Sequence, residues 1–72
     1  MNAIRRVRTR VLKVSQKALG EAAGVAQATV SRWEKGELSP SLHEVVRICE
    51  RHPEITPADF FSDQSVANGG AG

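Results

Sequence analysis

The sequence predicts an all-α domain of five short helices, and three observations support this fold class. Apolar residues recur at helical spacing in several segments. Cap residues, glycines and prolines divide the chain at the expected helix ends. No segment of the 72 residues has the alternating pattern of a strand. We expect one domain over residues 1–63, followed by a disordered Gly-, Ala- and Asn-rich tail over residues 64–72.

The first helix is expected over residues 3–12, where arginines separate the apolar residues of one face. That face consists of Ala3, Ile4, Val7 and Val11. The second helix is expected over Gln16–Ala23, with Ser15 as its N-cap. Gly24 ends it, because glycine adopts the left-handed conformation without strain.

The third helix is expected over residues 27–35, with Val30 and Trp33 facing inward and Gly36 after its end. The fourth helix begins at Leu42, behind a Ser-x-x-Glu capping box. Its apolar face is expected to hold Leu42, Val45, Val46 and Cys49, with Ile48 at the edge.

The fourth helix is expected to end at His52, because a residue before proline avoids helical angles. A fifth helix is expected over residues 57–61, with Thr56 as its cap and Pro57 in the first helical position.

The second and third helices, with the glycine-centred turn between them, have the pattern of a helix-turn-helix. Small residues at the expected crossing allow a close approach: Gly20, Ala22, Ala23 and Gly24. Because Val30 and Trp33 fix the inner face of the third helix, other positions must point outward: Gln27, Ala28, Ser31, Arg32 and Lys35. Gln can bond an adenine edge, Arg a guanine edge, and an Ala methyl can contact thymine. The sequence therefore predicts a helix that reads the DNA major groove.

Positive charge is concentrated near the N-terminus. Residues 1–17 contain six of the ten Lys and Arg residues and no acid, whereas residues 18–72 carry the other four and all eight Asp and Glu residues. A basic segment beside a helix-turn-helix favours contacts with phosphate over a solvated face without a partner.

This segment resembles the lambda-repressor and Cro-like helix-turn-helix family, also called the XRE-like group. The resemblance rests on Ser15-Gln16, Leu19, Gly24-Val25, Gln27 to Glu34, Gly36 and Pro40. It implies a sequence-specific transcriptional regulator, a homodimeric repressor of bacterial or phage origin. It implies base contacts by Gln27, Ala28, Ser31 and Arg32, and backbone contacts by Gln16, Lys35 and Ser39. We also expect Lys17, Thr29 and Arg10 to contact the DNA backbone.

Three departures from the family pattern bear on stability. Gly20 replaces the usual alanine, which costs the helix about 1 kcal/mol unless the helices pack closer there. Ala26 replaces the usual Ser/Thr cap of the third helix, a loss of about 0.5–2 kcal/mol. The segment from Arg8 to Val14 is one residue longer than usual, and we expect Arg8 to pair with Glu34.

The adjacent residues Phe60 and Phe61 cannot both be buried by one helix face. We expect Phe60 to fill the core, and Phe61 to form a two-fold dimer contact with Ile55. In the alternative, the tail or Ile55 partly covers both rings. A dimer would recognise an inverted repeat in double-stranded DNA, with half-sites about 34 Å apart.

Other classes of function have little support in the sequence. With the single Cys49 no internal disulfide is possible, which suits a cytoplasmic protein. No apolar run is as long as that of a signal peptide or a membrane span. Cys49, His43 and His52 are too few for a zinc site, so we expect neither metal nor cofactor. Ser15 and Ser31 lack a neighbouring base, so we expect no enzyme and no small-molecule substrate.

Two alternatives to a simple repressor remain at this point. An antitoxin or a restriction-modification controller would bind its own operon through the same fold. A protein-interaction module would use the fold to dock on the transcription machinery without reading bases. The outward residues of the third helix disfavour this module, because Gln27 and Arg32 are of the base-reading type.

Overall fold

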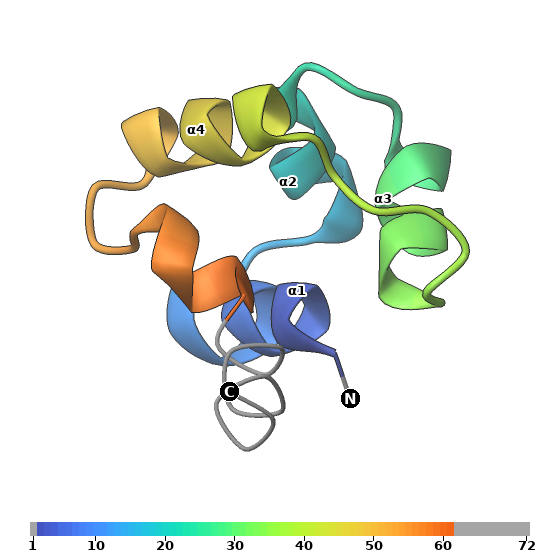
Figure 1. Ribbon diagram of the computed structural model, residues 1–72, viewed down its shortest axis with the longest axis horizontal. Coiled ribbons are helices and arrows are strands. Elements are labelled where there is room, and N and C mark those ends of the chain that lie inside the picture. Colours follow the sequence, from blue (N-terminus) through green and yellow to red (C-terminus); the bar gives the residue numbers. More distant parts are fainter. Residues whose placement is uncertain (1, 62–72) are drawn as a thin grey trace, which may run out of the picture.

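The computed structural model describes residues 2–61, and these residues form five helices (Figure 1). The first helix consists of α1 (Ala3–Arg6) and the π-helical η1 (Val7–Leu12). It is followed by α2 (Gln16–Ala23), α3 (Gln27–Glu34), α4 (Leu42–Arg51) and a last helix over residues 57–61. The all-α prediction is confirmed. The expected tail over residues 64–72 lies outside the described residues.

The first helix differs from the prediction in its second half. We expected an α-helix over residues 3–12, but η1 is a π-helix that ends at Lys13 in the left-handed conformation (φ 56°). The backbone N–H of Val14 bonds the carbonyl of Arg8 at 3.1 Å, which closes the helix end. The hydrogen bonds of a π-helix span one residue more than those of an α-helix. The wider turn of η1 leads the chain from Arg8 to Val14.

The π-helical turn also changes which side chain faces the core. Val11, four residues after the buried Val7, was expected on the buried face but is 51% exposed. Leu12, five residues after Val7, packs against the core instead. The reason is that residues five apart are neighbours in a π-helix, whereas residues four apart are neighbours in an α-helix.

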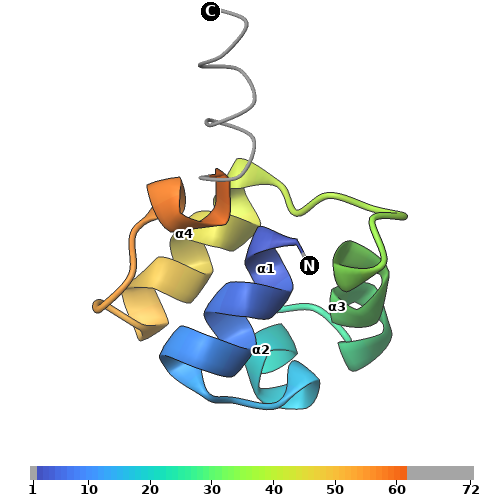
Figure 2. The ribbon, with the colours of Figure 1, turned by 90° about the horizontal axis from the view of Figure 1, so that it is seen from below.

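The core lies between α2, α3 and α4, with the first helix across its open side (Figure 2). Its largest fully buried side chains are Trp33, Leu19, Ile48, Val30 and Val45. The inward positions expected on α3 are therefore confirmed. Among the described residues, no helix is long and apolar enough to cross a membrane.

The turn between α2 and α3 explains why glycine stands at position 20 in α2 and at position 24 directly after it. Gly24 is left-handed (φ 80°), and the N–H of Val25 bonds the carbonyl of Gly20 at 2.8 Å. A Cβ atom on Gly20 would lie only 2.7 Å from the carbonyl oxygen of Val25. The glycine thus permits a close approach of α2 to the turn, which compensates for its low helix propensity.

The helix α4 has the predicted capping box, in which Ser41 bonds the N–H of Glu44 and the Glu44 carboxylate bonds the N–H of Ser41. Its buried face is rotated from the prediction. Leu42 and Val46 are 66% and 37% exposed, whereas Ile48, expected at the edge, is fully buried. Val45 and Ile48 lie three residues apart, so they form the buried stripe, with the half-buried Cys49 beside them.

The end of the described chain separates the two phenylalanines. Phe60 is buried in the core, as predicted, and Phe61 is half-buried against it. Ile55, expected beside Phe61 in a dimer contact, is only 4% exposed. Ile55 does not fit the expected dimer contact, because its side chain is buried in the core and is not exposed to a second chain.

Candidate nucleic-acid interface

The two faces of α3 differ sharply. Val30 and Trp33 are buried on the inner side. The outer side presents the residues expected to contact DNA: Gln27, Ala28 and Arg32 are exposed, Thr29 and Ser31 are half-buried, and Lys35 is exposed just after the helix. The structure therefore brings all four candidate base-contacting residues to one short helix, which we call the recognition helix.

The beginning of the recognition helix has no side-chain cap. Ala26 stands in the N-cap position with extended backbone angles, but its methyl group cannot accept a hydrogen bond. This confirms the missing cap that the sequence predicts. The cap is therefore missing at the N-terminal end of α3, next to the exposed Gln27.

The other end of the recognition helix is closed by a glycine turn. Gly36 is left-handed (φ 79°), its N–H bonds the carbonyl of Trp33 at 3.1 Å, and the N–H of Glu37 bonds the carbonyl of Arg32 at 3.0 Å. These two bonds form a Schellman motif. The turn sends the chain away from α3 and leaves the candidate backbone contact Ser39 exposed in the following loop.

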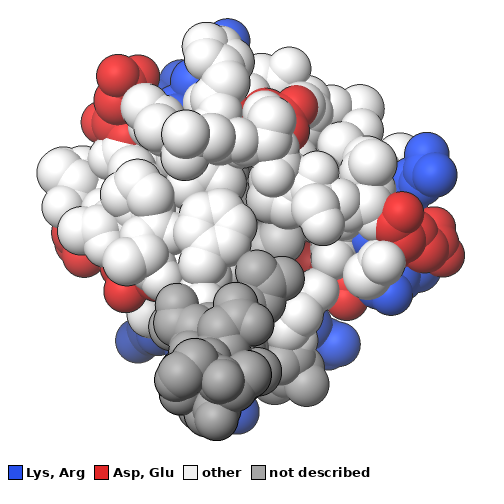
Figure 3. All heavy atoms as spheres, viewed as in Figure 1, with Lys and Arg blue, Asp and Glu red and all other residues white. Residues whose placement is uncertain are grey.

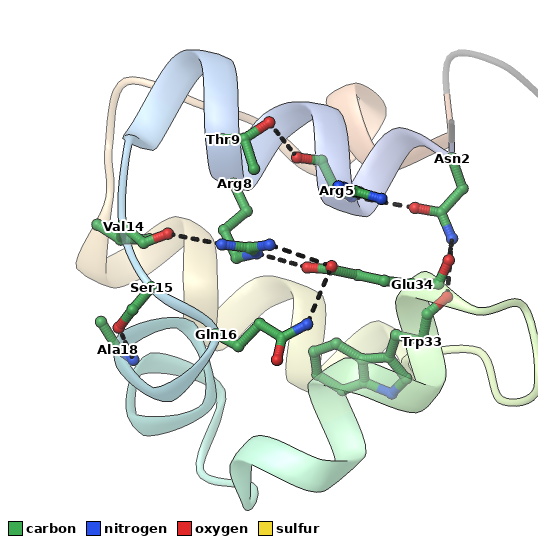
Figure 4. A network of polar contacts seen from close by, with 10 residues as sticks. All are labelled: Asn2, Arg5, Arg8, Thr9, Val14, Ser15, Gln16, Ala18, Trp33 and Glu34. Carbon is green, nitrogen blue, oxygen red and sulfur yellow. Dashed lines mark hydrogen bonds and ion pairs between the residues drawn. The ribbon is translucent and has the colours of Figure 1, made fainter.

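The carboxylate of Glu34 links three elements (Figure 4). Two nitrogens of Arg8 bond its two oxygens, Nη2 to Oε1 at 3.1 Å and Nε to Oε2, and the pair is almost buried. Nη1 of Arg8 also donates to the carbonyl of Val14 at 3.0 Å. The predicted partner of Glu34 is thus confirmed, and the π-helical turn of η1 leaves this pairing intact.

Gln16, expected to contact a phosphate, donates a hydrogen bond from Nε2 to Oε1 of Glu34 at 3.1 Å. This bond ties the beginning of α2 to the end of α3. Burial raises the pKa of Glu34, but the hydrogen bonds from Arg8 and Gln16 and the charge of Arg8 outweigh it, and the pKa is lowered. Glu34 is therefore a stable anion that anchors the recognition helix.

Arg32 has a neighbour that sequence reasoning missed. Its Nε lies 3.6 Å from Oε1 of Glu37, and both side chains are more than half exposed. The two residues are five apart, at the two ends of the Schellman motif that closes α3. The left-handed Gly36 folds the chain back and brings Glu37 beside Arg32. Because both side chains are exposed to solvent, this pair contributes little to stability.

The remaining candidate backbone contacts come from two other elements. Arg10 is exposed on η1 and Lys17 is exposed on α2.

A different face, shown in Figure 3, is formed by α4, the loop after α3 and the last helix, and it carries charged side chains mainly at its edges. Three apolar side chains of α4 and this loop are exposed: Leu38, Leu42 and Val46.

Comparison with known proteins agrees with this geometry. A family model described as Helix-turn-helix matches residues 4–60. No curated protein and no solved structure matches the chain. The matched range covers most of the chain and contains both α2 and α3 with the turn between them. The chain belongs to the XRE and lambda-repressor-like helix-turn-helix family of DNA-binding transcription regulators.

Proposed function

We propose that this protein is a sequence-specific repressor of bacterial or phage origin that binds an inverted-repeat operator as a homodimer. The observation that carries the proposal is the outer face of α3. Its inner residues Val30 and Trp33 are locked in the core, so the exposed Gln27, Ala28 and Arg32 have a fixed direction. A rigid helix with short polar side chains and one arginine suits the major groove.

Each outward residue has a distinct role in this proposal. Gln27 bonds the edge of an adenine, Arg32 bonds the edge of a guanine, and the methyl group of Ala28 contacts a thymine. Ser31 lies on the same face and makes a further base contact. Arg32 exchanges its exposed contact with Glu37 for the base when it binds DNA.

Contacts with the DNA backbone come from the residues around the recognition helix. The proposed contacts are Gln16, Lys17, Thr29, Lys35, Ser39 and Arg10. Lys17, Lys35 and Arg10 are exposed cations, so they strengthen binding to any duplex and make it depend on salt. A protein with these contacts acts where the DNA is, in the cytoplasm.

The dimer proposal rests on apolar side chains that are exposed to water in the monomer. Leu42 and Val46 lie four residues apart on α4 and are exposed, and Leu38 lies in the loop before them. Phe61 is half-buried and lines the same cavity as Leu38. We propose that Phe61 and these three residues contact a second copy, which sets the half-sites about 34 Å apart.

The proposal is tested by selecting bound sequences from a random duplex pool at physiological salt, with sedimentation of the same protein in parallel. A paired, inverted motif together with a dimer would support the repressor. Absence of enrichment, with binding that disappears as salt rises, would contradict it. Co-purification of a stoichiometric protein partner would then favour a protein-interaction module.

A further inference from the structure

The side chain of Asn2 joins the first helix to the recognition helix (Figure 4). Its Oδ1 accepts a hydrogen bond from the N–H of Arg5 at 3.0 Å, which caps the beginning of α1. Its Nδ2 donates to the carbonyls of Trp33 at 2.8 Å and Glu34 at 3.1 Å, the last two residues of α3. An asparagine can do both because its amide carries an acceptor and two donor hydrogens.

The bonds from Asn2 reach carbonyl groups at the C-terminal end of α3, where carbonyls need hydrogen-bond partners. The last four carbonyls of an α-helix have no partner within the helix. In α3, the carbonyl of Ser31 accepts from Lys35, and the Schellman bonds satisfy those of Arg32 and Trp33. The carbonyl of Glu34 accepts from Asn2, a residue 32 positions earlier in the chain.

Asn2 also brings two opposite helix ends together. The beginning of α1 carries partial positive charge, the end of α3 carries partial negative charge, and the two ends attract each other at short range. Arg8, six residues after Asn2, holds the side chain of Glu34 from the same first helix. The backbone and the side chain of Glu34 are therefore held independently, by Asn2 and by Arg8.

We propose that Asn2 is a positioning residue for DNA recognition. It fixes the end of α3 through the carbonyls of Trp33 and Glu34, and it thereby sets the direction of Arg32 and Lys35 without contacting DNA. The inference rests on the proposed sequence-specific binding, and it adds that the first helix controls how the recognition helix is presented. Loss of Asn2 should weaken binding to the preferred sequence more than binding to random duplex.

Two variants separate this role from the capping of α1. Both Ser and Asp are good N-caps, so Asn2→Ser and Asn2→Asp retain the acceptor for Arg5. Neither side chain can donate to Trp33 and Glu34 as the amide does, and Asp adds a negative charge beside their carbonyls. Ser41→Ala is the matched control, because it removes a helix cap from α4 and leaves α3 untouched.

The first measurement is the ratio of affinities for the selected duplex and a random duplex, at a temperature where every variant is folded. We expect Asn2→Ser to lower this ratio about tenfold, as the loss of its bonds to two carbonyls would. Asn2→Asp should lower it further, and Ser41→Ala should leave it within about twofold. An unchanged ratio in both Asn2 variants would overturn the inference.

The second measurement needs no DNA. Hydrogen exchange of the Lys35 and Glu37 amides, which bond carbonyls of α3, should accelerate in Asn2→Ser and stay unchanged in Ser41→Ala. Acceleration confined to the amides of α1 would contradict the inference. If the wild-type chain had no preferred sequence, the proposed function would fail with the DNA part of the inference, while exchange would still decide whether Asn2 holds α3.

Discussion

Arg8 and Glu34 form a two-point ion pair that joins the first helix to the end of the recognition helix. The two residues are 26 positions apart, and their side chains are only 14% and 7% exposed. A buried carboxylate is tolerated only when its charge is compensated. The pair therefore determines how α3 is attached to the rest of the domain.

Arg8→Ala should destabilise the domain by about 3 kcal/mol, because it leaves the charge of Glu34 largely buried with only the hydrogen bond from Gln16. Chemical denaturation would measure the free energy of unfolding. The exposed Arg10→Ala on the same helix is the matched control, with an expected change within about 0.5 kcal/mol. Equal effects of the two variants would mean that the ion pair does not support α3.

Stability should fall in acid because of Glu34. Its pKa is lowered in the folded protein, so its contribution is complete above the ordinary value of 4.5 and is lost as the pH falls through the folded pKa. Melting temperatures between pH 7 and pH 3 would show this loss. Glu34→Gln should lower stability at neutral pH and flatten the decline below pH 4.5. An unchanged decline in that variant would assign the acid sensitivity to other carboxylates.

Gly20→Ala should destabilise the domain although alanine is the better helix former. The added Cβ would meet the carbonyl oxygen of Val25 at 2.7 Å, and such overpacking costs about 1–3 kcal/mol. Gly36 provides the contrast, because its Cβ position is open and only its left-handed backbone restricts substitution. Asparagine should therefore be tolerated better than alanine at position 36, but not at position 20. Thermal unfolding of the four variants would check both statements.

Ala26→Ser should stabilise the domain by about 0.5–2 kcal/mol, because serine supplies the side-chain cap that α3 lacks. Denaturant titration would measure the gain. Ala28→Ser, two residues later inside the exposed face, places the same hydroxyl where no cap is needed and should give no gain. A gain at both positions would indicate an effect unrelated to capping.

Arg32→Ala should cost about 1–3 kcal/mol of binding free energy on the preferred duplex and relax the choice at one base pair. Binding isotherms on the selected sequence and on single-base variants would measure both effects. Removal of the neighbouring charge by Glu37→Gln should strengthen binding to random duplex, because Arg32 is then free to contact any phosphate. An equal loss on preferred and random duplexes in Arg32→Ala would mean that this residue contacts only the backbone.

The local signals in the sequence predicted most of the fold. Ser15, Gly24 and the capping box at Ser41 mark helix ends through bonds over a few residues, and the structure has all three. Trp33 and Val30 follow from helical periodicity. These features depend on neighbours in the chain, so a single sequence is sufficient to find them.

Several features that depend on distant contacts or on unusual backbone geometry were missed, although the pairing of Arg8 with Glu34 was predicted. The apolar pattern of the first helix fits an α-helix, and only the structure reveals that Leu12 replaces Val11 on the buried face. The bonds from Asn2 to α3 depend on how the ends of separate segments meet, and the approach of Glu37 to Arg32 depends on the left-handed turn at Gly36. The periodicity of the sequence does not reveal such contacts.

The π-helical turn of η1 couples the first helix to the helix-turn-helix that follows it. The turn ends at the left-handed Lys13, and α2 begins directly after its cap at Ser15. Arg8 lies near the start of the turn and bonds both the carbonyl of Val14, after the turn, and the carboxylate of Glu34 at the end of α3. The conformation of this connection and the attachment of α3 are therefore linked through one side chain.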